Sequence, residues 1–135
     1  MQEFYDYKDR WNSKQQEIME FLHNLFLNMP NMKFSFRYGG PFYDANTWVC
    51  YLAPKKNGKV ELVFINAHKL TRTINLLEKR DRKQVAGMNI EDITENTIEN
   101  VLLVMEEALE IDKLMNKNSK IFDFKNSHQK DNFKL

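Results

Sequence analysis

Carboxylates gather in the last third of the chain, where eight lie within residues 91–112 and no lysine or arginine interrupts them. At 100° per residue, a helix over residues 95–113 brings four glutamates into one narrow sector. These are Glu95, Glu99, Glu106 and Glu110. Carboxylate oxygens are ligands for hard and borderline cations, so this stripe is compatible with weak Fe²⁺ binding. A solvated face that keeps the protein in solution explains the same residues without a metal, and the sequence favours that explanation.

A second set of residues has the chemistry to hold a small ligand or a protein partner. Aromatic side chains supply apolar contact area, and tyrosine hydroxyls supply orientation. The candidate contact residues are Tyr38, Phe42, Tyr43, Trp48 and Tyr51, with Arg82 and Lys83 from a basic cluster. Residues 55–83 hold nine Lys or Arg against three acids, so this segment either contacts phosphates or pairs with the acidic helix of the same or another molecule.

The sequence gives little support for nucleic-acid binding, a zinc site or catalysis. The net charge of +1 argues against a nucleic-acid-binding protein, which is usually strongly basic. His23, His68 and His128 lack the spacing of zinc ligands, and His23 lies off the apolar stripe of its helix, which predicts an exposed side chain. Cys50 lies in mid-strand and is predicted to be a small buried residue rather than a nucleophile. Because no nucleotide loop, nucleophile elbow or zinc-protease motif is present, the sequence indicates neither an enzyme nor a resident cofactor.

The elements that must position these residues follow from hydrophobic periodicity. A helix is predicted from a Ser13–Gln16 capping box to Pro30, and a second over residues 95–113 with Thr94 as its cap. Between them, strands are predicted over residues 33–38, 47–53 and 60–65, with a fourth over 84–88, and Asn57-Gly58 marks a hairpin. Each helix has one apolar stripe. The prediction is therefore an α+β two-layer sandwich, an antiparallel sheet of four to five strands with both helices on one face.

The second face of this sheet is also predicted to be apolar. Strict alternation places Trp48, Cys50 and Leu52 on one side of the strand and Val49, Tyr51 and Ala53 on the other. An open sheet with one wet face should alternate apolar and polar residues more cleanly. We therefore expect a cover on the second face: the protein's own aromatic N-terminus (residues 4–11), the loop 70–77 or the tail, a second subunit in a homodimer, or a ligand.

Residues 1–115 are predicted to form a single domain, followed by a polar tail, 116–135, that is predicted to be mostly disordered, although Ile121, Phe122 and Phe124 could dock locally. One cysteine indicates a reducing compartment. The sequence shows no signal peptide and no apolar run of about 20 residues, so we expect a cytoplasmic protein without a membrane span.

Several segments resemble the bacterial YdhG-like domains of unknown function. They are Tyr38-Gly39-Gly40-Pro41-Phe42-Tyr43, Trp48-Val49-Cys50-Tyr51-Leu52, the strand from Lys59 to Phe64, and the stretch from Leu77 through Arg82-Lys83-Gln84-Val85. The resemblance runs from Trp11 to Leu114, with one departure at Ala67, where members often carry glycine. It implies a frataxin-like sandwich and the iron-chaperone role suggested for some members.

Overall fold

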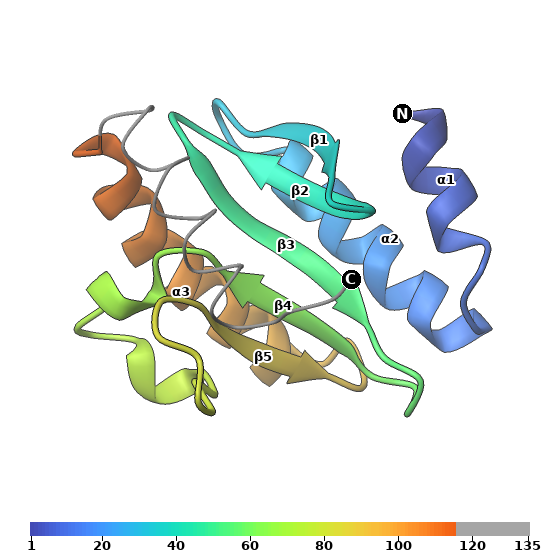
Figure 1. Ribbon diagram of the computed structural model, residues 1–135. Helices are drawn as coiled ribbons and strands as arrows, with labels where there is room; N and C mark the ends of the chain where they lie inside the picture. The colour runs from blue at the N-terminus through green and yellow to red at the C-terminus, as the bar shows by residue number, and fades with distance from the viewer. Residues whose placement is uncertain (116–135) are drawn as a thin grey trace.

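The computed structural model describes residues 1–115, so the predictions for residues 116–135, including the docking of Ile121, Phe122 and Phe124 and the place of His128, lie outside the described residues. The fold is α+β: two N-terminal helices, a five-stranded antiparallel open sheet and a C-terminal helix (Figure 1). The helices are α1 (Gln2–Lys8), α2 (Ser13–Leu27) and α3 (Glu95–Lys113). The strands are β1 (Lys33–Arg37), β2 (Gly40–Asp44), β3 (Trp48–Pro54), β4 (Val60–Phe64) and β5 (Ala86–Ile90).

The N-cap of helix α2 lies one residue before the predicted cap, so Ser13 is the first residue of the helix. Asn12, not Ser13, accepts a bond from the Gln15 amide at 2.8 Å, and the Gln15 side chain accepts one from the Asn12 amide at 3.3 Å. The capping box is therefore formed by Asn12 and Gln15, because asparagine caps a helix at least as well as serine. Helix α3 begins where it was predicted, with the Thr94 hydroxyl accepting from the Thr97 amide at 3.1 Å.

The sheet is a meander in which each strand pairs with its sequence neighbour, in the order β1-β2-β3-β4-β5. Strand β2 was not expected, because Gly39-Gly40-Pro41 was interpreted as a bend. Tyr38 and Gly39 instead form a two-residue hairpin loop with φ of 51° and 79°, the positive pair that tight hairpins require. The predicted strand at 84–88 is β5, two residues later along the chain.

A β-bulge changes which side chains share a face. Tyr43 pairs with Cys50 and Asp44 with Trp48, so Val49 is an extra residue in β3. The strict alternation predicted for this strand is therefore wrong at its start. Val49 packs in the cluster that contains Cys50 and Leu52, whereas Trp48 joins Tyr51 and Ala53.

The larger core cluster lies between the sheet and the helices. Both α2 and α3 lie behind the sheet in Figure 1, and both contribute to this cluster, α2 through Ile18, Met19, Leu22 and Phe26, and α3 through Val101, Val104 and Met105. Phe4 and Tyr7 of α1 are buried in the same cluster, so the N-terminal aromatics do dock, but on the helix side of the sheet. Leu102 of α3 is 42% exposed and does not belong to this cluster.

The segment between β4 and β5 holds two 3₁₀ turns, η1 (Ala67–Lys69) and η2 (Ile74–Leu76). Leu70 is buried, and Ile74 and Leu77 pack half-buried against the larger core, while Leu76 is 37% exposed. Leu70, Ile74 and Leu77 therefore hold this segment against the core. No helix within residues 1–115 is both long enough and apolar enough to cross a membrane.

Candidate functional site

The side of the sheet that faces away from α2 and α3, here called the outer face, carries a cluster of aromatic rings. Phe42 stacks on Tyr51 with ring centroids 4.9 Å apart, and Trp48 meets Phe42 edge-on at 6.0 Å. Tyr38 lies 6.1 Å from Trp48. The structure thus brings four of the five predicted aromatic site residues together. Phe42, Trp48 and Tyr51 are at most 6% exposed, and Tyr38 is 42% exposed.

Arg37 joins this cluster at its edge. Its guanidinium lies 4.6 Å from the centre of the Trp48 ring, within the range of a cation–π contact. Its Nε donates to the Ser35 hydroxyl at 2.9 Å, and its Nη2 lies 3.4 Å from Asp44 Oδ2. The bulge that turns Trp48 outward therefore places an indole under a positive charge. This arrangement was not predicted, because strict alternation put Trp48 on the opposite face from Tyr51.

Tyr43, the fifth predicted aromatic residue, lies on the helix side of the sheet. Its hydroxyl is 2.7 Å from His23 Nδ1, and burial raises its pKa well above the usual range. His23 is only 2% exposed, so the prediction that it is exposed is wrong. Its ring stacks on Phe4 at 3.7 Å. Burial, with a smaller contribution from the N-terminal amine, lowers the pKa of His23 to about 4. A ligand on the outer face would reach neither residue.

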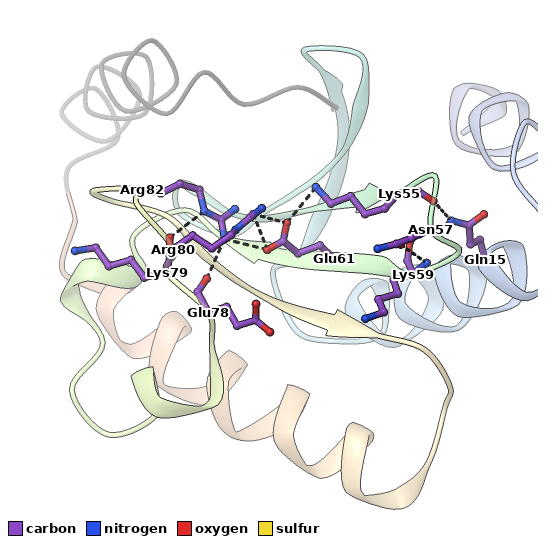
Figure 2. A network of polar contacts seen from close by, with 9 residues as sticks. All are labelled: Gln15, Lys55, Asn57, Lys59, Glu61, Glu78, Lys79, Arg80 and Arg82. Atoms are coloured by element: carbon purple, nitrogen blue, oxygen red, sulfur yellow. Dashed lines mark hydrogen bonds and ion pairs between the residues drawn. The ribbon is translucent and has the colours of Figure 1, made fainter.

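The other half of the outer face carries a buried ion-pair network centred on Glu61 of β4 (Figure 2). Arg80 Nη2 lies 3.0 and 3.1 Å from the two carboxylate oxygens, Arg82 Nη2 lies 3.0 Å from Oε2, and Lys55 Nζ lies 3.3 Å from Oε1. Glu61 and Arg82 are almost fully buried, with side chains 2% and 6% exposed. A buried carboxylate of this kind needs such partners, because an unpaired buried charge is strongly destabilising.

Predicted contact residue Arg82 has a structural role in this network. Besides the bond to Glu61, its Nη2 donates to the Glu78 carbonyl at 2.9 Å and its Nε donates to the Lys79 carbonyl at 3.2 Å. It therefore holds the loop before β5 against the sheet. Lys83, the neighbouring predicted contact, is exposed. Lys55 is positioned from the other side, because the Gln15 side chain of α2 donates to the carbonyls of Lys55 and Lys59 at 2.7 and 3.1 Å (Figure 2).

Gly87 makes room for the Glu61 side chain. A Cβ atom at this position of β5 would lie 2.3 Å from Glu61 Oε2 and 2.7 Å from its Cδ. Those separations are well inside van der Waals contact, so only glycine lets the carboxylate lie across β5. The glycine, the carboxylate and the two arginines come from separate segments, which is why periodicity alone did not group them.

A cleft runs around the turn between β2 and β3. Its larger part has a volume of about 550 Å³ and is lined by Pro30, Asn31, Lys33, Ala45, Asn46, Leu109, Asp112 and Lys113. A smaller part of about 130 Å³ shares Lys33, Ala45 and Asn46 with it and extends to Arg37 and Trp48. The two hollows therefore lie side by side, one against the C-terminal end of α3 and the other against Trp48 of the aromatic cluster. Within residues 1–115, neither Lys33 nor Lys113 forms an ion pair.

The predicted acidic stripe lies on the solvent side of α3. Glu95, Glu99, Glu106 and Glu110 are all exposed, and Glu110 pairs with Arg72 at 3.0 Å. Among residues 1–115, no group of three or more His, Cys, Asp or Glu side chains is close enough to hold a metal ion. Weak iron binding by the stripe therefore stays a prediction.

Two other acids of α3 have roles that the sequence did not show. Glu107 accepts bonds from the amides of Thr71, Arg72 and Thr73 at 2.8 to 3.2 Å and from the Thr73 hydroxyl at 2.8 Å. Burial works to raise the pKa of Glu107, but these bonds outweigh it and hold the pKa at about 2. Asp112 likewise accepts from the amides of Asn46 and Thr47 at 2.7 and 2.9 Å. Both carboxylates fasten loops to the helix.

Cys50 is fully buried, as predicted, and His68 is exposed on η1. No family model, no curated protein and no solved structure matches this chain. The YdhG-like resemblance therefore stays a prediction, and the function has to be argued from the geometry.

Proposed function

We propose that this chain is a small binding module whose ligand surface is the cleft around the β2–β3 turn, together with the edge of the aromatic cluster. One observation carries this proposal: two adjacent hollows of about 550 and 130 Å³ share Lys33, Ala45 and Asn46, and their lining includes two lysines, Lys33 and Lys113, without ion-pair partners in residues 1–115. Small-molecule sites usually have volumes of about 300–1,000 Å³ and combine apolar walls with a few polar groups.

The lining suits a small molecule with an acidic group. Lys33 and Lys113 supply positive charge, and Pro30, Ala45 and Leu109 supply apolar wall. Asp112 also lines the cleft, but its carboxylate already accepts the Asn46 and Thr47 amides. At the far end, the Arg37 guanidinium over the Trp48 ring adds a third positive charge. A segment of a protein partner that carries an acidic group would fit the same surface.

The test is an NMR screen of ¹⁵N-labelled full-length protein against a library of small acidic and aromatic fragments. We expect the fragments that bind to shift the amides of Lys33, Ala45, Asn46, Trp48 and Lys113. Ala45→Trp places an indole in the cleft and should weaken these fragments at least tenfold. Lys56→Trp adds the same ring to the hairpin at the opposite end of β3 and should leave binding unchanged. Fragments that bind equally to Ala45→Trp, or that shift none of these amides, would refute the proposal.

The alternative is an iron chaperone with a frataxin-like two-layer sandwich of the YdhG-like type. It is supported by three exposed glutamates, Glu95, Glu99 and Glu106, that form no ion pair within residues 1–115. Because no preformed cluster is present there, binding would be weak and exchangeable. Anaerobic Fe²⁺ should then broaden the NMR signals of these glutamates selectively, and the triple glutamine variant should lose the effect. If millimolar Fe²⁺ does not broaden these signals, the iron-chaperone role is excluded.

A further inference from the structure

The Glu61 network on the outer face contains more positive than negative charge. Three cations, Lys55, Arg80 and Arg82, surround one carboxylate, which leaves an excess of two positive charges. Within residues 1–115, none of the acids in the flanking segments, Glu78, Asp81 and Glu91, forms an ion pair with these three cations. The Glu78 carboxylate forms no ion pair within residues 1–115, and Glu91 pairs with Lys59 instead.

The three cations do not have equal roles. Arg82 is buried, and within residues 1–115 its guanidinium donates to Glu61 and to the backbone carbonyls of Glu78 and Lys79. Arg80 and Lys55 are 50% and 33% exposed, and their only polar side-chain contacts within residues 1–115 are with Glu61. An arginine has five N–H donors and a lysine has three, so both keep donors that Glu61 does not occupy. Figure 2 shows the two side chains approaching the carboxylate from opposite sides.

The backbone at Arg80 is strained to make this arrangement. Its φ is 56°, in the left-handed region where a residue with a side chain costs roughly 1 kcal/mol. The next residue along the chain, Asp81, is exposed. Strained residues of this kind are concentrated at binding sites, where the surrounding structure holds them. Here the strained residue is also the most exposed cation of the network.

We propose that Arg80 and Lys55 form a binding site for a phosphate group of a small molecule, with Glu61 and Arg82 as its fixed base. A phosphate monoester carries about −1.5 to −2 charges near neutral pH, which matches the excess of two positive charges better than a single carboxylate does. The planar guanidinium of Arg80 can donate two parallel bonds to phosphate oxygens, and Lys55 adds a point charge. This site lies on β4 and its flanking loops and does not depend on the cleft at the β2–β3 turn.

The experiment is a titration of full-length protein with inorganic phosphate, followed by ¹⁵N NMR, beside a sodium chloride titration of equal ionic strength. Glycerol phosphate serves as a second probe. We expect saturable shifts at Lys55, Glu61 and Arg80 with either phosphate and not with chloride. Tighter binding of the ester would identify an organic phosphate as the natural ligand, whereas equal binding would identify free phosphate.

Arg80→Gln and Lys55→Gln should each weaken phosphate binding at least tenfold, and Lys56→Gln, on the same hairpin, should not. Each variant leaves the buried Glu61–Arg82 pair in place, so at least one should keep the wild-type fold, which its NMR spectrum will show. Ala45→Trp, which fills the cleft, should leave phosphate binding unchanged. Shifts that do not saturate, shifts that persist in both glutamine variants, or binding to nucleic acid alone would overturn the proposal.

Discussion

At the scale of single residues, the most consequential position is a glycine. Gly87 is needed for space, since the Glu61 carboxylate occupies the volume that any side chain there would fill. Its substitution should act through Glu61 and through the three cations that depend on it. Gln15 is another single residue on which two parts of the structure depend. Its side chain completes the cap of α2 and also holds the β3–β4 hairpin.

We therefore expect Gly87→Ala to lower the free energy of unfolding by about 1–3 kcal/mol, the usual cost of forcing extra atoms into a packed site. Urea denaturation of four proteins, wild type, Gly87→Ala, Glu61→Ala and the double variant, gives the coupling between the two positions. If the clash with Glu61 is the cause, the alanine at 87 should cost far less once Glu61 is removed. Equal costs in both backgrounds would show that the glycine is needed for another reason.

At the scale of elements, α3 is joined to the rest of the molecule by carboxylates as well as by apolar packing. Glu107 holds the loop at residues 71–73 and Asp112 holds the β2–β3 turn, so two loops distant in sequence are fixed to one helix. Of the exposed glutamates of α3, Glu110 adds an ion pair with Arg72 of the same loop, whereas Glu95, Glu99 and Glu106 form no ion pair within residues 1–115.

Replacing Glu107 should destabilise the protein, whereas replacing an exposed glutamate of the same helix should not. Glu107→Gln removes the negative charge to which three backbone amides donate. It should lower the free energy of unfolding by about 2–3 kcal/mol at pH 7. Because the pKa of Glu107 is about 2 when folded, against an ordinary value of 4.5, its contribution is complete above pH 4.5 and is lost as the pH falls toward 2. Urea denaturation at pH 7 and pH 3 should therefore show a smaller difference in the free energy of unfolding between wild type and Glu107→Gln at pH 3 than at pH 7. Glu106→Gln, its exposed neighbour, should match wild type at both pH values.

The sequence predicts elements better than it predicts their contacts. Periodicity located α2, α3, β3 and β4, because each has a long apolar pattern or a strong cap. It missed β2, since Gly40-Pro41 is typical of a bend, and α1, since seven residues are too few to show a helical period. The bulge at Val49 is invisible in the sequence, and it reversed the expected direction of Trp48. The Glu61 network joins residues 55, 61, 80 and 82, so it exists only once β4 and β5 have paired.

At the scale of the whole molecule, stability should depend on pH through His23. This histidine lies at the junction of α1, α2 and β2, where it stacks on Phe4 and contacts the Tyr43 hydroxyl. Its folded pKa of about 4 lies below the ordinary 6.5, so the unfolded chain takes up the proton more readily. The stabilising contribution is present above pH 6.5 and is lost as the pH falls through 4.

We expect the free energy of unfolding to fall by roughly 2–3 kcal/mol between pH 7 and pH 4 for this reason. Urea denaturation across that range should show a much smaller change for His23→Gln, which keeps a hydrogen-bonding group but has no titrating ring. His68→Gln removes an exposed histidine and should follow wild type. Hydrogen exchange at pH 4.5 should show α1 opening before α2. A profile for His23→Gln that parallels wild type would contradict this assignment.

The meander order of the sheet has a consequence for how the chain assembles. Three of its four strand pairings are made by hairpins with short connections, so bringing those strands together costs little chain entropy. The β4–β5 pairing alone must close the long segment 65–85, which delays it relative to the others. Assembly should therefore proceed from β1–β4 to β5, with the phosphate site and the docking of α3 completed in the late phase of the folding reaction.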